Sequence, residues 1–264
     1  MIGFIKSILR YRGFILGNVK REFQAKYQNS ILGAAWNVLN PLAMITVYTV
    51  IFSQVMKAKL PGVEDTFAYS IYLCSGILTW SLFSEIISRG QNVFIEQANL
   101  IKKISFPRIC LPAIVIVNAL VNFFIVFILF TAFLLISGEF PGIQFISIFP
   151  LILTLIVFAI GLGITLGVMN VFFRDVGMLF SIILQFWFWL TPIVYSPAIL
   201  PLQFQNIVKL NPMLSIISSF QLVFVQHQWP HWFDLLYPLS LGLILCAIGM
   251  ILFNKHSGDM VDEL

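Results

Sequence analysis

Charged residues are scarce in this chain. Asp, Glu, Lys and Arg make up 10% of the 264 residues, whereas hydrophobic residues make up 59%. A typical soluble domain carries about 25% charged residues. A fold surrounded by water cannot bury so much apolar surface, so the composition excludes a soluble enzyme and indicates an all-α polytopic membrane protein.

Catalytic and metal-binding motifs are missing too. The phosphate-binding pattern GxxxxGK[ST] does not occur, so we expect no ATP hydrolysis through that motif on this chain. The three cysteines, Cys74, Cys110 and Cys246, lie in apolar stretches without the spacing of metal ligands. We therefore predict no catalytic residue, no metal site and no cofactor on this chain.

Residues 1–32 are basic, with six Lys or Arg residues and one acid, Glu22. Apolar residues recur there every three to seven positions, at Ile8, Ile15, Val19, Phe23 and Tyr27. This spacing predicts an amphipathic helix that lies in the membrane interface. A disordered basic tail is the alternative.

Six apolar segments predict six transmembrane helices within residues 33–264. A span takes about 20 residues. The expected spans are residues 36–55, 69–87, 111–136, 146–172, 178–194 and 235–253. Twelve Lys and Arg residues fall on the side of the termini and three on the other side, which places both termini in the cytoplasm and explains the net charge of +4 without a nucleic-acid partner.

Two connections differ from simple loops. The cytoplasmic loop 88–109 mixes apolar and charged residues in a pattern that predicts a short amphipathic helix at about 93–105. The outer link 195–234 contains the apolar piece Leu214–Val225, which is too short to span. We predict a re-entrant or interfacial helix there, because such a helix must lie against protein or a wet cavity.

Polar residues inside the spans are few, and we interpret them as structural. Glu85 precedes Arg89 by four residues, which favours an ion pair along one helix. Asn118 and Asn122 also lie four residues apart, as expected for hydrogen bonds between helices. Gly163 and Gly167 predict a close helix contact in the same way.

Aromatic residues are the distinctive class. Four consecutive rings occupy positions 186–189, and Tyr195 follows them. Ring faces can stack on the C–H edges of sugars, so we predict a carbohydrate path, with ordinary packing as the alternative. The candidate path residues are Tyr48, Phe52, Phe186, Trp189 and Tyr195. Helical spacing predicts that Phe186 and Trp189 point together and that Phe188 points elsewhere.

Four blocks of residues occur in order along nearly the whole chain. They are Arg21-Glu22 with Lys26-Tyr27, Ser30, Leu32-Gly33, Trp36 and Pro41; Lys102-Lys103 with Phe106-Pro107-Arg108 and Leu111-Pro112; Asn170 to Asp175; and Thr191 to Tyr195 with Asn211-Pro212. With these blocks the chain resembles the membrane subunit of bacterial ABC transporters that export lipid-linked polysaccharide, most closely the O-antigen exporters.

The resemblance implies an assembly and a substrate. Two copies of the six-span subunit would pair with two separate ATPase subunits, which bind ATP and Mg, in the bacterial inner membrane. The substrate would be a glycan on undecaprenyl diphosphate, moved from the cytoplasmic to the periplasmic face. The helix at 93–105 would be a coupling helix that docks into the ATPase, and the outer link would form gate helices.

Specific residues follow from these implied roles. A diphosphate needs paired cations near the cytoplasmic interface, and we assign it to Arg21, Lys26 and Tyr27. The coupling residues would be Phe94, Glu96, Leu100, Ile101 and Lys102.

Several alternatives stay open. Capsule and teichoic-acid exporters share the same blocks. An ion-coupled secondary transporter is another alternative, and such a protein typically has buried carboxylates or histidine relays and internal repeats. A membrane enzyme that acts on lipid is a third alternative, and it typically has a cluster of His, Asp or Arg at one interface.

Overall fold

The computed structural model describes residues 10–26, 33–51, 67–98, 102, 110–197 and 200–263. Within these ranges the chain is helical and contains no strand. The helices are α2 (Arg12–Lys26), η1 (Gly33–Ala35), α3 (Trp36–Thr49), α4 (Ala68–Glu96), α6 (Cys110–Ser137), η3 (Gly142–Ser147), α7 (Ile148–Phe172), α8 (Asp175–Leu190), α9 (Leu202–Val208), α10 (Pro212–Gln226), η5 (Trp232–Leu235), α11 (Leu236–His256) and α12 (Asp259–Glu263).

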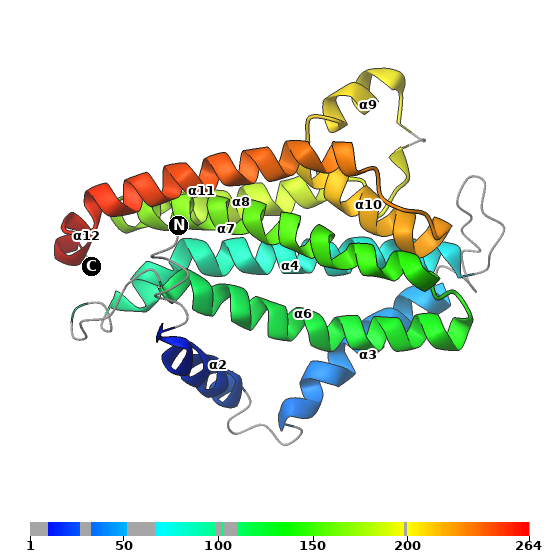
Figure 1. Cartoon of the computed structure of the whole chain (residues 1–264), viewed down its shortest axis with the longest axis horizontal. Coiled ribbons are helices and arrows are strands. Elements are labelled where there is room, and N and C mark those ends of the chain that lie inside the picture. The colour runs from blue at the N-terminus through cyan, green and yellow to red at the C-terminus, as the bar shows by residue number, and fades with distance from the viewer. Residues whose placement is uncertain are drawn as a thin grey trace.

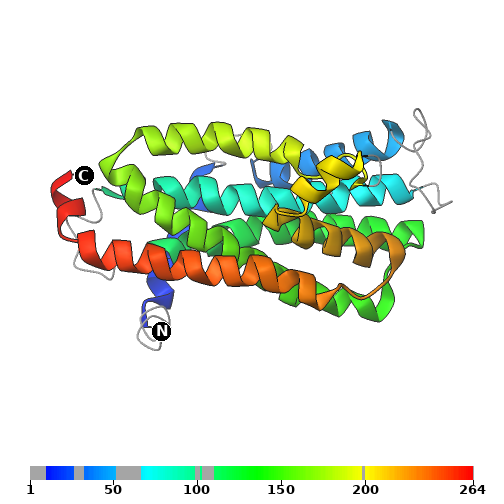
Figure 2. The same cartoon turned by 90° about the horizontal axis from the view of Figure 1, so that it is seen from above.

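The long helices run side by side along the longest axis of the molecule (Figure 1). α2 and α12 lie near one end of this bundle, and α9 and α10 lie near the other. Figure 2 shows α8 along one edge, beside α4 and away from α11. Helices far apart in sequence therefore form one bundle with two distinct ends.

Four helical segments are long and apolar enough to cross a membrane: Ala68–Glu96, Cys110–Ser137, Gly142–Phe172 and Trp232–His256. They confirm the expected second, third, fourth and last spans as long apolar helices. The first expected span continues past residue 51, outside the described residues, so the described α3 has only 14 residues.

The expected fifth span ends earlier than predicted. α8 has 16 residues and stops at Leu190, where the prediction continued to residue 194. Thr191 adopts an extended conformation (φ −96°, ψ 132°). Pro192 follows it, and the residue before a proline is sterically pushed out of the helical region.

Glycines bring the central helices into close contact, as predicted for Gly163 and Gly167. A side-chain carbon added at Gly167 would lie 2.6 Å from the carbonyl oxygen of Gly90 in α4. On the other side of α7, one added at Gly161 would lie 2.7 Å from the carbonyl oxygen of Gly242 in α11. Small residues at such contacts let helix backbones approach closely, which is how helices associate in membranes.

The apolar stripe of α2 faces the bundle. Ile15 and Val19 are buried in a cluster that includes Val93 of α4 and Leu111 and Ile114 of α6. The predicted periodicity of α2 is therefore confirmed for these two residues, and the surface they cover is protein. Tyr27 and residues 1–9, which include Ile8, lie outside the described residues.

Candidate functional site

A groove lined by aromatic, apolar and polar side chains runs between α4 and α8. α4 contributes Trp80, Ser84 and Ser88, and α8 contributes Ser181, Leu184, Gln185, Phe188 and Trp189. The side chains of Ser181 and Gln185 are exposed, and the residues next to them in α8 are apolar. An amide facing lipid hydrocarbon is costly, so this stripe is suited to water, a polar ligand or another protein surface.

The groove combines ring faces with hydroxyl and amide groups. The Ser181 hydroxyl donates to the carbonyl oxygen of Gly177 at 2.8 Å, and it accepts a hydrogen bond from the Gln91 amide at 3.2 Å. Trp189 is 63% exposed, whereas the ring of Phe188 packs edge-on against Trp80 with centroids 5.7 Å apart. Exposed rings beside weak hydrogen-bonding groups can stack on and bond to a carbohydrate chain.

The structure separates the predicted path residues. Phe186 and Trp189 are both highly exposed, but only Trp189 lines the groove, so the groove does not unite the two rings that helical spacing placed together. Tyr48 lines a cavity between α3, α4 and α6, on a different face of α4 from the groove. Phe52 lies outside the described residues. One chain therefore does not bring Tyr48 and Trp189 together.

Tyr195 does not extend α8 as a further helical turn. The chain reverses after Leu190, and the Tyr195 hydroxyl donates to the carbonyl oxygen of Trp189 at 3.2 Å. Partial burial raises the pKa of the Tyr195 phenol above its usual value, so the hydroxyl stays protonated and can donate.

The turn after α8 is hydrogen-bonded to α4. The Tyr72 hydroxyl lies 3.2 Å from the carbonyl oxygen of Pro192 and 2.9 Å from that of Tyr195. The Tyr69 hydroxyl donates to the carbonyl oxygen of Val194 at 2.6 Å. Ile193, between them, is fully buried. These contacts fix the turn at the Trp189 end of the groove relative to α4.

Asn211 joins the same turn to α10. Its side-chain oxygen accepts from the backbone N–H of Met213, which caps the first turn of α10, and from the indole N–H of Trp187 at 2.9 Å. Its amide donates to the Thr191 hydroxyl at 2.8 Å. The short helix expected at Leu214–Val225 is confirmed as α10, one face of which is buried.

A polar cluster connects α2, α4 and α6 at the opposite half of the bundle. Arg89 forms ion pairs with Glu85, at 3.0 Å, and with Glu22 of α2. Asn122 donates to Glu85 at 2.6 Å, and Asn118 donates to Glu22. The predicted Glu85–Arg89 pair and the interhelical role of both asparagines are confirmed.

This cluster constrains where a diphosphate can bind. The adjoining cavity is lined by Arg21 and Arg89 but also by Glu22 and Glu96, so its charges cancel. Arg89 is already shared between two carboxylates. Arg21 is exposed, and its guanidinium donates to Asn18 at 2.9 Å, so it is the more accessible of the two cations.

The remaining predicted diphosphate residues are only partly covered. Lys26 is the last residue of α2, and its side chain is outside the described part of the structure. Tyr27 lies outside the described residues.

The start of the expected coupling helix is corrected. α4 continues through Val93 and Phe94 to Glu96, so these residues do not begin a separate helix. Phe94 is 1% exposed, and its ring stacks on Phe253 with centroids 5.5 Å apart. The assignment of Phe94 to a partner-facing surface is wrong, because its side chain fills the interior between α4 and α11.

The other coupling candidates lie at the end of α4 or beyond it. Glu96 and Lys102 are both exposed. Leu100 and Ile101 lie outside the described residues, as does most of the segment 93–105 beyond α4.

The groove residues Trp80, Ser84, Ser88, Ser181 and Gln185 were not predicted from the sequence. A signal for them exists, because 80, 84 and 88 on α4 and 181, 185 and 189 on α8 each repeat at a spacing of four. Residues four apart share a helix face, so each set forms a polar and aromatic stripe. The sequence does not show that the two stripes face each other.

Comparisons with known proteins agree with a transport role. Residues 15–225 match the family described as ABC-2 type transporter. The O-antigen export system permease protein RfbA of Myxococcus xanthus is 27% identical over 267 residues, covering 100% of both chains. A protein of the same name from Klebsiella pneumoniae is 30% identical over 237 residues, covering 89% of this chain and 88% of the relative. The polysialic acid transport protein KpsM of Escherichia coli is 21% identical over 247 residues, covering 91% of this chain and 92% of the relative.

Proposed function

Because the chain belongs to the ABC-2 type transporter family, we propose that it forms the membrane path of an ATP-driven exporter of O-antigen polysaccharide linked to undecaprenyl diphosphate. The groove between α4 and α8 carries this proposal. Its hydroxyl, amide and aromatic groups lie together along two membrane helices, and this combination favours a carbohydrate occupant.

A sliding polysaccharide suits this chemistry. Its binding groups must be weak, repeated and tolerant of different sugars, or the chain would stop moving. One aromatic contact contributes about 0.5–1.5 kcal/mol beyond its buried area, so several rings hold the glycan and none traps it. In this proposal Trp189 stacks on the sugars, Gln185 and the serines exchange hydrogen bonds with them, and Tyr195 stands at the outer mouth.

The assembly we propose is a homodimer in the bacterial inner membrane. In this assembly each subunit has six spans. Four are the long apolar helices, the fifth is α3 with the residues after it, and the sixth is α8 with the turn after it. Both termini are cytoplasmic. Two separate ATPase subunits bind ATP and Mg and dock at the cytoplasmic end. Glu96, Leu100, Ile101 and Lys102 are the proposed coupling residues, supported by the exposure of Glu96 and Lys102 at that end.

We propose that the lipid diphosphate enters at α2. Arg21, Lys26 and Tyr27 remain the candidates, because the guanidinium of Arg21 is exposed while Arg89 is paired with two carboxylates. The diphosphate then meets the bundle at the junction of α2 and α3.

A capsule polysaccharide is the second candidate cargo. The similarity to polysialic acid transport proteins at 21% identity supports it, although the full-length similarity to O-antigen export permeases is higher. The groove chemistry suits either glycan, so the two differ only in the sugar carried.

A deletion strain tests the proposal. We expect lipid-linked glycan to accumulate on the cytoplasmic face and the surface polysaccharide to disappear, and mass spectrometry of the lipid fraction identifies the sugars. Wild-type protein restores surface display, whereas Gln185→Leu at equal abundance restores less. Normal surface polysaccharide in the deletion strain would refute the proposed function.

A further inference from the structure

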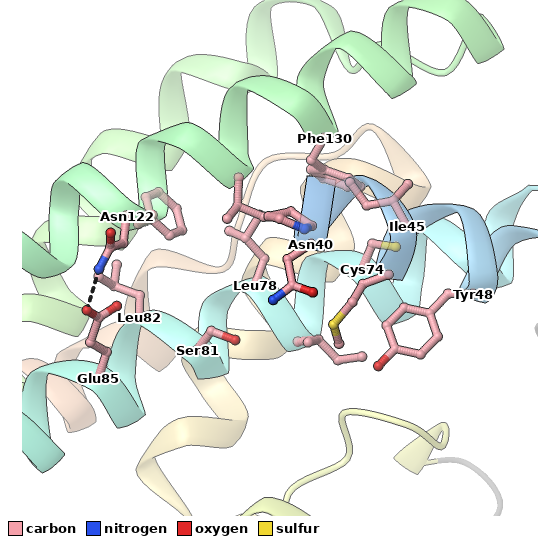
Figure 3. Close-up of a pocket in the computed structure, with 15 residues that line it drawn as sticks. Asn40, Ile45, Tyr48, Cys74, Leu78, Ser81, Leu82, Glu85, Asn122 and Phe130 are labelled. Atoms are coloured by element: carbon pink, nitrogen blue, oxygen red, sulfur yellow. Dashed lines mark hydrogen bonds between the residues drawn. The ribbon is translucent and has the colours of Figure 1, made fainter. Parts of the chain in front are cut away.

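A second, mostly apolar cavity lies between α3, α4 and α6, away from the proposed glycan groove (Figure 3). Its volume is about 230 Å³, larger than the roughly 150 Å³ cavity that accommodates a benzene ring. Ile45, Leu78, Leu82 and Phe130 contribute to its apolar wall. α3 runs obliquely to α4 and α6, so these helices diverge at one end (Figure 1).

The length of the cavity matches one membrane leaflet. On α4 the lining extends from Cys74 to Glu85, which at 1.5 Å per residue is about 16 Å. Half of the hydrocarbon core of a bilayer measures about 15 Å. The cavity therefore matches a single acyl chain of one leaflet in length, whereas a polyprenyl chain is far longer than the cavity.

Glu85 marks the polar end. It lies about 26 Å along α4 from Ala68, close to the far boundary of a hydrocarbon core that is about 30 Å thick. In the orientation proposed above, that boundary is the cytoplasmic one. A lipid whose chain fills the cavity from the inner leaflet would therefore place its headgroup beside Glu85.

The charges around Glu85 favour a cationic headgroup. Glu85 is the one charged residue among those that line the cavity in the described part of the chain. Its Oε1 atom accepts from both Asn122 and Arg89, and within the described residues Oε2 forms no hydrogen bond. Two carboxylates, Glu22 and Glu85, share the single guanidinium of Arg89, which leaves one negative charge in excess.

We propose that this cavity binds one acyl chain of an inner-leaflet phospholipid with an ammonium headgroup, and that the ammonium donates to Glu85. The bound chain fills the space that separates α3 from α4 and α6, so the lipid acts as a structural ligand that sets the position of α3. The inference rests on the orientation in the proposed function. It does not involve the transported glycan.

Native mass spectrometry of the purified full-length protein tests this. The protein is extracted in mild detergent and incubated with equal amounts of dioleoyl phosphatidylethanolamine and dioleoyl phosphatidylglycerol. We expect one retained lipid per chain, with phosphatidylethanolamine in excess. In Glu85→Gln, which keeps the shape and removes the charge, we expect that excess to fall about tenfold, as for the loss of a charge-assisted hydrogen bond.

Two matched variants separate cavity binding from lipid adhering elsewhere. Ser81→Phe places a ring in the cavity, because Ser81 lines it, and we expect the retained lipid to be lost. Thr46→Phe adds the same ring on the exposed face of α3, outside the lining, and we expect retention to match the wild type. Gel filtration and a thermal melt show that both variants are folded.

The proposal fails if the wild type retains no more lipid than Ser81→Phe, or if Glu85→Gln leaves the headgroup ratio unchanged. A retained isoprenoid in place of the phospholipid would also overturn it. Because lipid retention is measured without transport, an exporter that binds no lipid here refutes this inference alone.

Discussion

The hydroxyl group of Tyr72 lies 2.9 Å from the carbonyl oxygen of Tyr195, joining two residues that are 123 positions apart. The same hydroxyl lies 3.2 Å from the carbonyl oxygen of Pro192. Tyr72 is buried on α4, so water does not readily replace these contacts. α4 thereby holds the turn that follows α8 at the Trp189 end of the groove.

Tyr72→Phe should destabilise the protein while preserving its fold. The substitution keeps the ring and leaves buried carbonyl groups without their donor, which costs about 1–3 kcal/mol. For a chain of this size we expect the thermal unfolding midpoint in detergent to fall by about 2–6 °C.

Tyr237→Phe is the control. The Tyr237 hydroxyl donates to the carbonyl oxygen of Leu210 at 2.9 Å, but this contact is exposed, so water replaces it and the midpoint should change little. Equal shifts in the two variants would mean that Tyr72 does not hold the turn after α8 in place.

The second prediction concerns the attachment of α2. Glu22→Gln removes the ion pair with Arg89, while Glu85 still pairs with Arg89. We expect α2 to detach more often, because a partly exposed pair contributes about 1 kcal/mol. Trypsin should therefore cleave within α2 about fivefold faster, as followed by mass spectrometry of the products.

Gln24→Ala serves as the matched change on α2, since the Gln24 side chain is exposed. It should leave the cleavage rate at the wild-type value. Unchanged cleavage in Glu22→Gln would show that the apolar contacts of α2, including those of Ile15 and Val19, are sufficient to hold it.

Much of the bundle could be predicted from the sequence because it follows from one helix at a time. α6 covers residues 110–137 where an apolar run predicted 111–136. The Glu85–Arg89 pair lies within one helix, so its spacing was sufficient to predict it. Such features depend on periodicity and length, which the sequence displays directly.

Features that depend on two helices were less predictable. Periodicity shows which residues share a face of their own helix, but it does not show which helix that face meets. The sequence pattern predicted Phe94 as a docking residue, but in the structure its ring stacks on Phe253 of α11. Tyr48 and Trp189 were expected on one path, yet their helices contact different faces of α4.

The Asn170–Asp175 block illustrates the same limit. Asn170 is buried, and its side chain donates to the carbonyl oxygen of Gln91 at 2.9 Å and accepts from the backbone N–H of Gly177 at 2.9 Å. It therefore fixes the turn between α7 and α8 against α4. The resemblance identified the block, but only the fold explains why an asparagine is needed.

The third prediction concerns the α4–α7 contact. Gly167→Ala would place a methyl group 2.6 Å from the carbonyl oxygen of Gly90, so the two helices must separate. We expect a loss of about 1–3 kcal/mol, measured as a lower thermal midpoint. Gly163→Ala is the control on the same helix, because its methyl group would lie at an ordinary 3.5 Å from Gly90. If the two alanines behave alike, the close approach at Gly167 does not limit the packing.

The last prediction tests the glycan groove. Trp189→Ala should slow export at equal protein abundance, because it removes an exposed ring that lines the groove. A ring contact of about 0.5–1.5 kcal/mol corresponds to a rate decrease of roughly two- to twelvefold, and adding Tyr195→Ala should decrease the rate further. Inverted membrane vesicles supplied with ATP and a labelled lipid-linked glycan measure the rate.

Alanine variants of two other aromatic residues of α8 distinguish an effect on transport from an effect on packing. Phe186 is as exposed as Trp189 but does not line the groove, so Phe186→Ala should export at the wild-type rate if the groove is the path. Phe188 packs against Trp80, so Phe188→Ala should lower the thermal midpoint and change the rate per folded molecule less than the Trp189 variant does. Slower export from Phe186→Ala than from Trp189→Ala would place the glycan path outside the groove, because Phe186 is exposed but does not line it.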